Sequence, residues 1–337
     1  MFQFIRDYSQ NEAGIPLVYL LFFFEFLSQS YSIVDVEKRV VMLLQPCQIC
    51  WLCMATKGND NNLQYCFLDD SQHAAFWSTY LQVPPWDPNS PPPYTNLSGF
   101  AVSMIVPDLL HVLNLGIGRD IAGSILQVLL KQNHVFIGGN LEEKFGAATA
   151  SLRSYAKSNS LPLRMRKITK KRLNWGTDRY AELKTGSGYD NYVVCRWLQN
   201  VLEPHADKYP EFCTLLWALN GSMHVLYNAN WFLTDTERFQ VKAMGGLFIR
   251  MFLQLATEAV DSQRFLFRIR PKFHLMQHIL FCRRKINCAK YSTWMDEDFL
   301  RKVARTMKLT PGVTTQERTL QRWLMAIPES LRKSMAN

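Results

Sequence analysis

Cysteine and histidine gather early in the chain at spacings that can hold a metal ion. Two overlapping C-x2-C pairs are followed by a fourth cysteine and a histidine, all within 27 residues. The candidate ligands are Cys47, Cys50, Cys53, Cys66 and His73. Zn²⁺ takes four such ligands in a tetrahedron, so we expect a structural zinc knuckle here. The alternative is a set of buried free thiols that fill space beside Trp51.

A second metal-capable pattern lies in the sequence PKFHLMQH near the C-terminal end. His274 and His278 stand four residues apart, so a helix would place both on one face. Such a pair can bind a metal ion or a phosphate. Two partly buried histidines that bond to the backbone explain the pattern equally well, and the sequence leaves both open.

Carboxylates form the third candidate group. Asp108 stands between a short apolar run and a helical pattern, where it can cap the helix, or hold a divalent metal with His111 one turn further on. Glu297 and Asp298 stand at the start of a later helical pattern. Acidic residues at a helix start are stabilised by the helix dipole, so these two need no other role. A catalytic use of these groups would require Mg²⁺ or Mn²⁺.

The positive charge of the chain is concentrated in two stretches. Residues 153–184 carry ten basic and two acidic side chains, and residues 262–290 carry eight basic and no acidic side chains. Each stretch is therefore net +8, against +10 for the whole chain. This pattern favours a phosphate-rich partner, and we expect DNA. Solvated faces or a disordered tail are the alternative.

The residues expected to contact DNA phosphates are the consecutive or near-consecutive cations of the two stretches. They are Arg164, Arg166, Lys167, Lys170, Lys171, Arg172, Arg283, Arg284 and Lys285. A membrane partner is disfavoured, because the apolar run 15–27 is too short to span a bilayer and is interrupted by Glu25. That run is either part of the core or a targeting segment.

Composition limits the class of protein. The chain has 337 residues, of which 48% are hydrophobic and 20% charged, so wholesale disorder, collagen-like and coiled-coil structures are excluded. Half of the eight cysteines lie within twenty residues of each other, which in a long chain indicates metal binding rather than a disulfide framework. We therefore expect a reducing compartment, nuclear or cytoplasmic.

The elements that must position these groups are mostly helical. Apolar spacing predicts helices near 190–202, 211–227 and 234–260, the last opened by a capping box at Thr234 and Glu237. Short apolar runs predict strands within 33–41, 101–106 and 265–269. Glycines should break or kink the helical pattern 108–130. Inward-facing residues are expected at Leu226, Phe232, Leu247, Phe252 and Leu255.

Along the chain these elements suggest six consecutive parts. They are N-terminal core strands in 1–44, a Cys-rich knuckle with a Pro-rich connector in 45–100, a core strand and helix in 101–135, a basic linker in 136–189, a helical insertion in 190–263, and a helical C-terminal part of the core in 264–337.

Four short motifs, taken in their order, resemble transposon-derived proteins, and the nearest comparison is with DDE transposases of the CACTA and Plavaka-like type. The motifs are CWLCMATKG from Cys50, VPDLLH from Val106 running to Gly116, RPKFH from Arg270 running to His278, and WMDEDF from Trp294. The resemblance covers about residues 47–324, and none of the motifs is diagnostic alone.

This resemblance implies an α+β, predominantly helical fold, with an RNase H-like mixed sheet core interrupted by a helical insertion. It also implies three carboxylates that hold two divalent metals for phosphodiester cleavage and strand transfer. Asp108 would be the second carboxylate and Glu297 or Asp298 the third. The first has only Asp35 or Glu25 as stand-ins, neither in the expected context, so the resemblance implies a truncated or degenerate transposase that still binds DNA.

Three classes of function therefore remain open at this point. They are an active metal-dependent nuclease or transposase, a zinc-knuckle nucleic-acid-binding protein without nuclease activity, and an inert helical protein with a hydrophobic N-terminal segment.

Overall fold

The computed structural model describes residues 49–57, 64–101 with gaps at 70, 72, 83–88, 90 and 92, residue 104, residues 106–281 and 285–294, and five isolated later positions. These residues form a helical body. Its helices are η4 (Leu110–Ile117), α4 (Gly118–Lys131), α5 (Leu141–Ser158), α6 (Gly188–Leu202), α7 (Pro210–Asn228), α8 (Asp235–Asp261) and α9 (Pro271–Phe281). Short 3-10 helices are η1 (Ala75–Thr79), η2 (Pro93–Asn96) and η5 (Glu203–His205).

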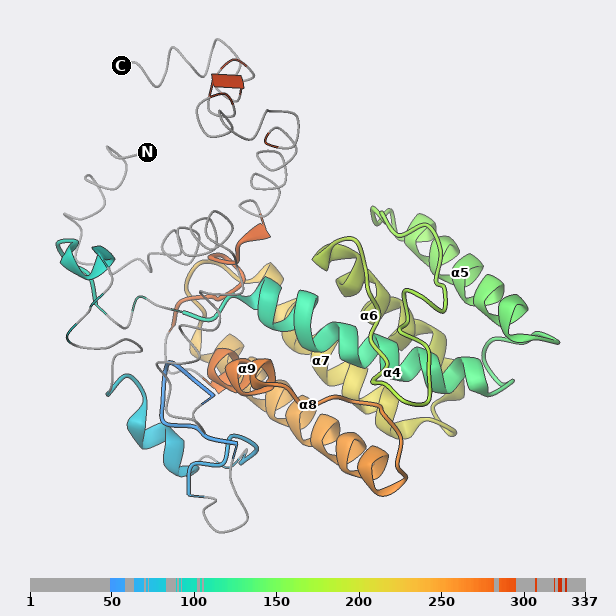
Figure 1. The fold of residues 1–337 in the computed structure, drawn as a ribbon, viewed down its shortest axis with the longest axis horizontal. Coiled ribbons are helices and arrows are strands. Elements are labelled where there is room, and N and C mark those ends of the chain that lie inside the picture. Colours follow the sequence, from blue (N-terminus) through green and yellow to red (C-terminus); the bar gives the residue numbers. More distant parts are fainter. Residues whose placement is uncertain are drawn as a thin grey trace.

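Helix α4 lies in the middle of the body (Figure 1) and packs against η4, α5 and α6. Helices α7 and α8 form the most extensive pair, and α9 packs against α8 and η4. Residues 49–82, drawn in blue and cyan in Figure 1, lie beside α9. The segment with the C-x2-C pair is therefore brought to a helix that follows it by about 220 residues.

Local sequence explains where the helices begin. Helix α8 opens with the expected capping box, because the Thr234 side chain accepts from the Glu237 N–H and the Glu237 carboxylate accepts from the Thr234 N–H. Asn140 and Ser187 cap α5 and α6 through their side chains. Pro210 occupies the first turn of α7, where its missing N–H costs nothing.

The expected glycine break in the first long helical stretch is confirmed at Gly116, whereas Gly118 and Gly123, expected to break it as well, lie within the regular helix α4. Residues 110–117 form a π-helix before the regular α4, and Gly116 has non-helical dihedral angles of φ −121° and ψ −107°. A Cβ atom at Gly116 would lie 2.9 Å from the His111 carbonyl oxygen and 2.8 Å from the Lys272 side chain. The close approach of these groups therefore requires glycine at this position.

The expected mixed sheet is absent from the described part of the chain, so the RNase H-like fold is wrong for it. Extended pairing there is limited to two isolated bridges, Thr56 with Cys66 and Phe232 with Ile286. Everything else regular is helix. The expected strand at 33–41 lies outside the described residues.

The two other expected strands fail for local reasons. The Met104 N–H donates to the Ala101 carbonyl at 2.8 Å, which closes a turn instead of extending the chain. In the run 265–269, Phe267 adopts φ of +49°, which no strand tolerates. Short apolar runs do not distinguish a strand from a buried loop, and here tertiary burial of Leu266 and Phe267 explains the hydrophobicity.

The range 190–263 is helical as expected, with one exception among the inward-facing residues. Leu226, Phe252 and Leu255 are buried, and Leu247 is half-buried. Phe232 is 60% exposed, because it lies in the turn between α7 and α8 and not on a helix face.

The range 136–189, expected to be a basic linker, contains the 18-residue helix α5 and an irregular segment that packs on the body. Met165, Ile168 and Leu173 of that segment are buried. The segment crosses α4 at Gly123, where a Cβ atom would lie 2.6 Å from the Glu182 backbone. Glycine is therefore needed for this crossing.

Two helical stretches, Leu110–Lys131 and Asp235–Asp261, are long and apolar enough to cross a membrane by length and composition alone. The protein buries 83% of the most apolar window of the first and 44% of that of the second. The apolar composition of the first stretch therefore matches its place in the core.

Candidate metal centre

Two half-sites from distant parts of the sequence meet in the protein core. The first is the C-x2-C pair, in which Cys50 and Cys53 are 0% and 4% exposed. The second is the histidine pair on α9, in which His274 and His278 are 0% and 2% exposed. Helical spacing of four residues places both imidazoles on one face of α9. The Leu52 N–H donates to Cys50 Sγ at 3.2 Å, which fixes the tight turn of the cysteine pair.

The ligand atoms of these four residues all lie within 4.8 Å of one another. Cys53 Sγ lies 3.2 Å from His274 Nε2 and 3.4 Å from His278 Nε2, and Cys50 Sγ lies 3.4 Å from His278 Nε2. The two Nε2 atoms are 2.9 Å apart. A tetrahedral Zn²⁺ with bonds of about 2.0 Å to nitrogen and about 2.3 Å to sulfur places neighbouring ligand atoms about 3.3 to 3.8 Å apart. These four observed distances differ from the tetrahedral separations by only a few tenths of an ångström, so the group is compact enough to bind one ion.

The protonation of the cysteine pair is uneven. Burial alone would raise the pKa of Cys50, but hydrogen bonds from Cys53, His274 and His278 outweigh it and hold that pKa well below its usual value. The hydrogen bond with Cys50, then burial, raises the pKa of Cys53 far above its usual value. Burial lowers the pKa of His278, which favours the neutral imidazole that binds metals. A thiolate at Cys50 and a neutral imidazole at His278 are thus favoured before any metal binds.

A hydrogen bond behind the centre orients His274. Its Nδ1–H donates to Gln277 Oε1 at 3.0 Å, which leaves the Nε2 lone pair toward the sulfur atoms. The Gln277 amide in turn donates to the Asp69 carbonyl oxygen at 3.5 Å, so the orienting residue ties α9 to the cysteine-bearing segment. Metal-binding histidines commonly use their second nitrogen in this way.

Aromatic side chains of the cysteine-bearing segment enclose the imidazoles. Phe76 meets His274 edge-on at 4.7 Å between ring centroids, and Trp77 meets His278 edge-on at 5.1 Å. Tyr80 stacks on His278 at 5.3 Å. These rings cover the two imidazoles with apolar surface.

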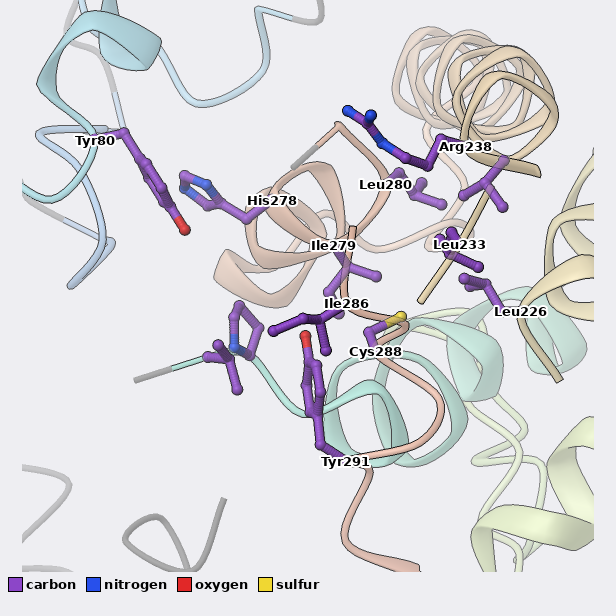
Figure 2. A pocket seen from close by; sticks show the side chains of 13 residues that line it. Tyr80, Leu226, Leu233, Arg238, His278, Ile279, Leu280, Ile286, Cys288 and Tyr291 are labelled. Carbon is purple, nitrogen blue, oxygen red and sulfur yellow. The ribbon is translucent and has the colours of Figure 1, made fainter. Parts of the chain in front are cut away.

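A small cavity adjoins the far side of His278 (Figure 2). It lies among Tyr80, Arg238, Cys288 and Tyr291 and has a volume of about 40 Å³. Figure 2 shows Tyr80 and His278 facing each other at one side of it, with Leu226 and Leu233 at the other. Substrate pockets usually measure about 300 to 1,000 Å³, so this cavity holds only a few water molecules.

The arrangement is that of a closed site. Two sulfur and two nitrogen ligands in a tetrahedron suit Zn²⁺, and four protein ligands leave no coordination position for water or substrate. Such a centre can hold two chain segments together, and it cannot activate a water molecule in the way an open, three-ligand zinc site does.

Only some of the five ligands expected from the first cluster lie in the observed site. It brings Cys50 and Cys53 together, whereas Cys66 and His73 are not part of the group, and Cys47 lies outside the described residues. Cys66 is fixed opposite Thr56 in a backbone bridge, and it is the next residue, Phe67, that packs against His274. His73 is exposed.

Both halves of the observed site were visible in the sequence, but their pairing was not. C-x2-C and H-x3-H are the two halves of the Cys2His2 pattern. The match of the two pairs to the Cys2His2 pattern is the only signal in the sequence that could have paired them. Zinc fingers separate the halves by about 12 to 15 residues, whereas here Cys53 and His274 are 221 positions apart.

Asp108 serves as a buried hydrogen-bond acceptor. Its Oδ1 accepts from Ser292 Oγ and the Thr293 N–H, and its Oδ2 accepts from the His111 N–H and Nδ1 and from Thr293 Oγ1. Burial alone would raise the pKa of Asp108, but the hydrogen bond and charge of His111 and the bonds from Thr293 lower it to about 2.

A carboxylate offers about four lone pairs, and five donors already converge on those of Asp108. The arrangement therefore gives no support to Mg²⁺ or Mn²⁺ binding at this residue. The other expected carboxylates, Asp35, Glu297 and Asp298, lie outside the described residues.

The DNA-contacting residues expected in the first stretch lie on the irregular segment 161–187. Arg164, Arg166, Lys167, Lys170 and Lys171 are exposed, and Arg172 is half-buried with its guanidinium donating to the Lys184 carbonyl oxygen. In the second stretch Lys285 is exposed, and Arg283 and Arg284 lie outside the described residues.

Comparison of the chain with protein-family models, with curated proteins and with solved structures finds no match to any of them.

Proposed function

We propose that the protein binds one structural Zn²⁺ ion through Cys50, Cys53, His274 and His278. The observation that carries this proposal is the convergence of four buried ligand atoms within 4.8 Å of one another. Without an ion, the thiols and imidazoles have hydrogen bonds to one another, and a bound Zn²⁺ would replace these with four metal–ligand bonds.

The role of the ion follows from where its ligands lie. The cysteines belong to a segment with little regular structure, whereas the histidines lie on a helix packed against α8 and η4. Zinc bound to both would clamp the segment 49–82 to the helical body. In small zinc domains the apparent binding free energy is about 10 to 16 kcal/mol, and it contributes directly to folding.

Metal analysis of purified ligand variants tests this proposal. Wild-type protein should carry about one zinc ion per chain, because the four ligands form one tetrahedral site. Cys50→Ala and His278→Ala should lose the ion, whereas Cys66→Ala and His73→Ala should retain it. Zinc-free wild-type protein, or loss of zinc in the second pair of variants but not the first, would refute this ligand set.

A second candidate function is nucleic-acid binding by the basic segment 161–187, and the alternation of its side chains favours it. Met165, Ile168 and Leu173 are buried, while Arg166, Lys167, Lys170 and Lys171 between them are exposed, with Lys170 paired to Glu142 at 3.4 Å. The Ile168 N–H donates to Thr149 Oγ1 and the Arg164 N–H to Asp190 Oδ1, so the segment is anchored to α5 and α6.

Part of the second basic stretch lies against this segment. The Ala181 N–H donates to the Phe265 carbonyl oxygen at 3.1 Å, and the Arg268 guanidinium lies 5.5 Å from the centroid of the Tyr180 ring. Exposed cations of both stretches therefore add to one positive surface. A rigid array of cations binds phosphates with less loss of side-chain and backbone entropy than a mobile tail.

Salt dependence of duplex DNA binding tests the second candidate. Each phosphate contact should contribute about −0.9 to the slope of log affinity against log salt concentration. Replacing Lys170, Lys171 and Arg172 by alanine should flatten the slope by up to about 3 for all sequences alike. Binding that is independent of salt, or no binding at low salt, would exclude this function.

A further inference from the structure

Three large aromatic side chains stand exposed where α7 turns into α8. Trp231 is 54% exposed, Phe232 is 60% exposed and Phe239 is 73% exposed. We name these three residues the aromatic corner. Single exposed apolar residues are common on protein surfaces, but here three large rings are exposed within nine residues of the sequence, and clusters of exposed apolar side chains mark binding sites.

The backbone beneath the corner is held firmly. The Leu233 N–H donates to the Lys285 carbonyl oxygen at 2.7 Å, and the Asn287 N–H donates to the Trp231 carbonyl oxygen at 2.8 Å. The buried Asn287 amide also donates to the Leu226 carbonyl oxygen at the end of α7, at 2.7 Å. The rings therefore project from a fixed backbone, and their exposure is a feature of the fold.

Phe239 belongs to the same corner through α8. It follows the capping box in the second turn of the helix, where the helix start is fixed by reciprocal hydrogen bonds. The Asp235 carboxylate in the first turn lies 3.1 Å from Arg238 Nη1 and 4.0 Å from Lys285 Nζ. This contact brings the start of α8 next to the segment that pairs with Trp231 and Leu233.

Positive charge surrounds the rings. Lys285 is exposed beside the Trp231 segment, and Lys242 is exposed three residues after Phe239, on the same side of the helix. Together with Arg238 they make three cations, against Asp235 and Glu237. The Glu237 carboxylate keeps its negative charge in the capping box, so the three cations exceed the two acids by one.

We propose that the aromatic corner binds single-stranded nucleic acid, with bases stacked on the exposed rings and phosphates near Lys285 and Lys242. Aromatic platforms among basic side chains are the usual means of binding single strands without sequence preference. The corner shares no residue with the zinc centre or with the basic segment 161–187, so the proposal goes beyond both functions above.

A membrane surface fits the same corner less well. Insertion would carry the rings into the apolar layer together with the Asp235 side chain, which is 80% exposed, and would bring that carboxylate against anionic head groups. Stacking of bases on the rings would instead leave the Asp235 carboxylate in water. Exposed amides adjoin the rings, with Asn230 before Trp231 and Gln240 after Phe239, and amides suit base edges better than acyl chains.

Fluorescence anisotropy with a labelled 20-nucleotide oligothymidine and a labelled duplex of equal length tests the proposal on the full chain. Each lost stacking ring weakens single-strand binding by roughly 5- to 150-fold. Trp231→Ala combined with Phe239→Ala should therefore weaken oligothymidine binding at least tenfold. The matched control is Trp217→Ala, because Trp217 on α7 is also 54% exposed and lies outside the corner.

Every outcome bears on the proposal. Tenfold or greater weakening in the corner variant, with the control near wild type and equal thermal stability and zinc content, supports it. Unchanged oligothymidine affinity in the corner variant overturns it. Binding to vesicles containing phosphatidylserine without oligothymidine binding, or a dimer that the corner variant abolishes, also overturns it.

The same assay separates this proposal from nucleic-acid binding by the basic segment. The alanine triple variant at Lys170, Lys171 and Arg172 should weaken duplex binding and leave stacking at the corner intact. If that variant loses duplex affinity while the corner variant binds oligothymidine normally, the corner proposal fails and the basic-segment function stands.

Discussion

Replacing Cys53 by alanine should remove the contribution of the metal to stability. The Cys53 sulfur is close to both imidazoles, at 3.2 Å and 3.4 Å, so its loss leaves three ligands and opens the site. An ion present at 100 to 1,000 times its dissociation constant stabilises the folded state by about 2.7 to 4.1 kcal/mol. At about 2 to 4 °C per kcal/mol for a body of this size, the melting temperature should change by roughly 5 to 16 °C.

The assay compares the shift caused by a chelator and not the absolute melting temperature. Each protein is refolded with either EDTA or a small excess of Zn²⁺, since a closed site releases its ion slowly, and is then melted. Wild type should lose roughly 5 to 16 °C in EDTA. Cys53→Ala should melt low under both conditions and show almost no shift.

Cys195→Ala is the matched control for a buried thiol. Cys195 on α6 is 5% exposed, burial raises its pKa to about 12, and it lies outside the metal-capable group. Its variant should lose some stability from the missing sulfur but keep the full chelator shift. A wild-type protein that ignores EDTA, or a Cys195→Ala variant that loses the shift, would show that the four-ligand reasoning is mistaken.

Four further substitutions test the helical body by denaturant unfolding. Gly123→Ala should destabilise by about 1 to 3 kcal/mol, because its Cβ would lie 2.6 Å from the Glu182 backbone; Gly146→Ala, with open space around it, should be neutral or gain up to about 1 kcal/mol. Asp108 has its pKa lowered to about 2, so its contribution of about 2 kcal/mol is present above pH 4 and is lost as the pH falls through 2; Asp108→Asn should flatten the loss of stability between about pH 4 and pH 2. Thr234→Ala should cost about 1 kcal/mol through loss of the capping box, and a variant as stable as wild type would contradict that role.

Local signals in the sequence predict local structure well. The capping box at Thr234 and Glu237 correctly marked the start of α8, and the glycine break at Gly116 was foreseen from the low helix propensity of glycine. These features depend on residues a few positions apart. The energies that decide them are therefore contained within a short window of sequence.

Features that depend on distant contacts were predicted poorly. The apolar runs 101–106 and 265–269 predict strands, whereas their buried residues Val106, Leu266 and Phe267 lie in irregular segments of the chain. The metal centre shows the same limit. Cys50 and Cys53 were correctly singled out, but nearby Cys66 and His73 were preferred to histidines that only the fold brings close.

The distance of 221 positions between Cys53 and His274 has a consequence for how the protein is made. A ribosome adds about 5 to 20 residues per second, so the cysteine pair is synthesised about 10 to 45 s before the histidines that complete its coordination sphere. Closing so long a loop also costs about 2 kcal/mol more chain entropy than closing the roughly 15-residue loop of a zinc finger. In the proposed zinc centre the four ligands come together only after the helices have assembled, so the two thiols would have to remain reduced throughout that interval.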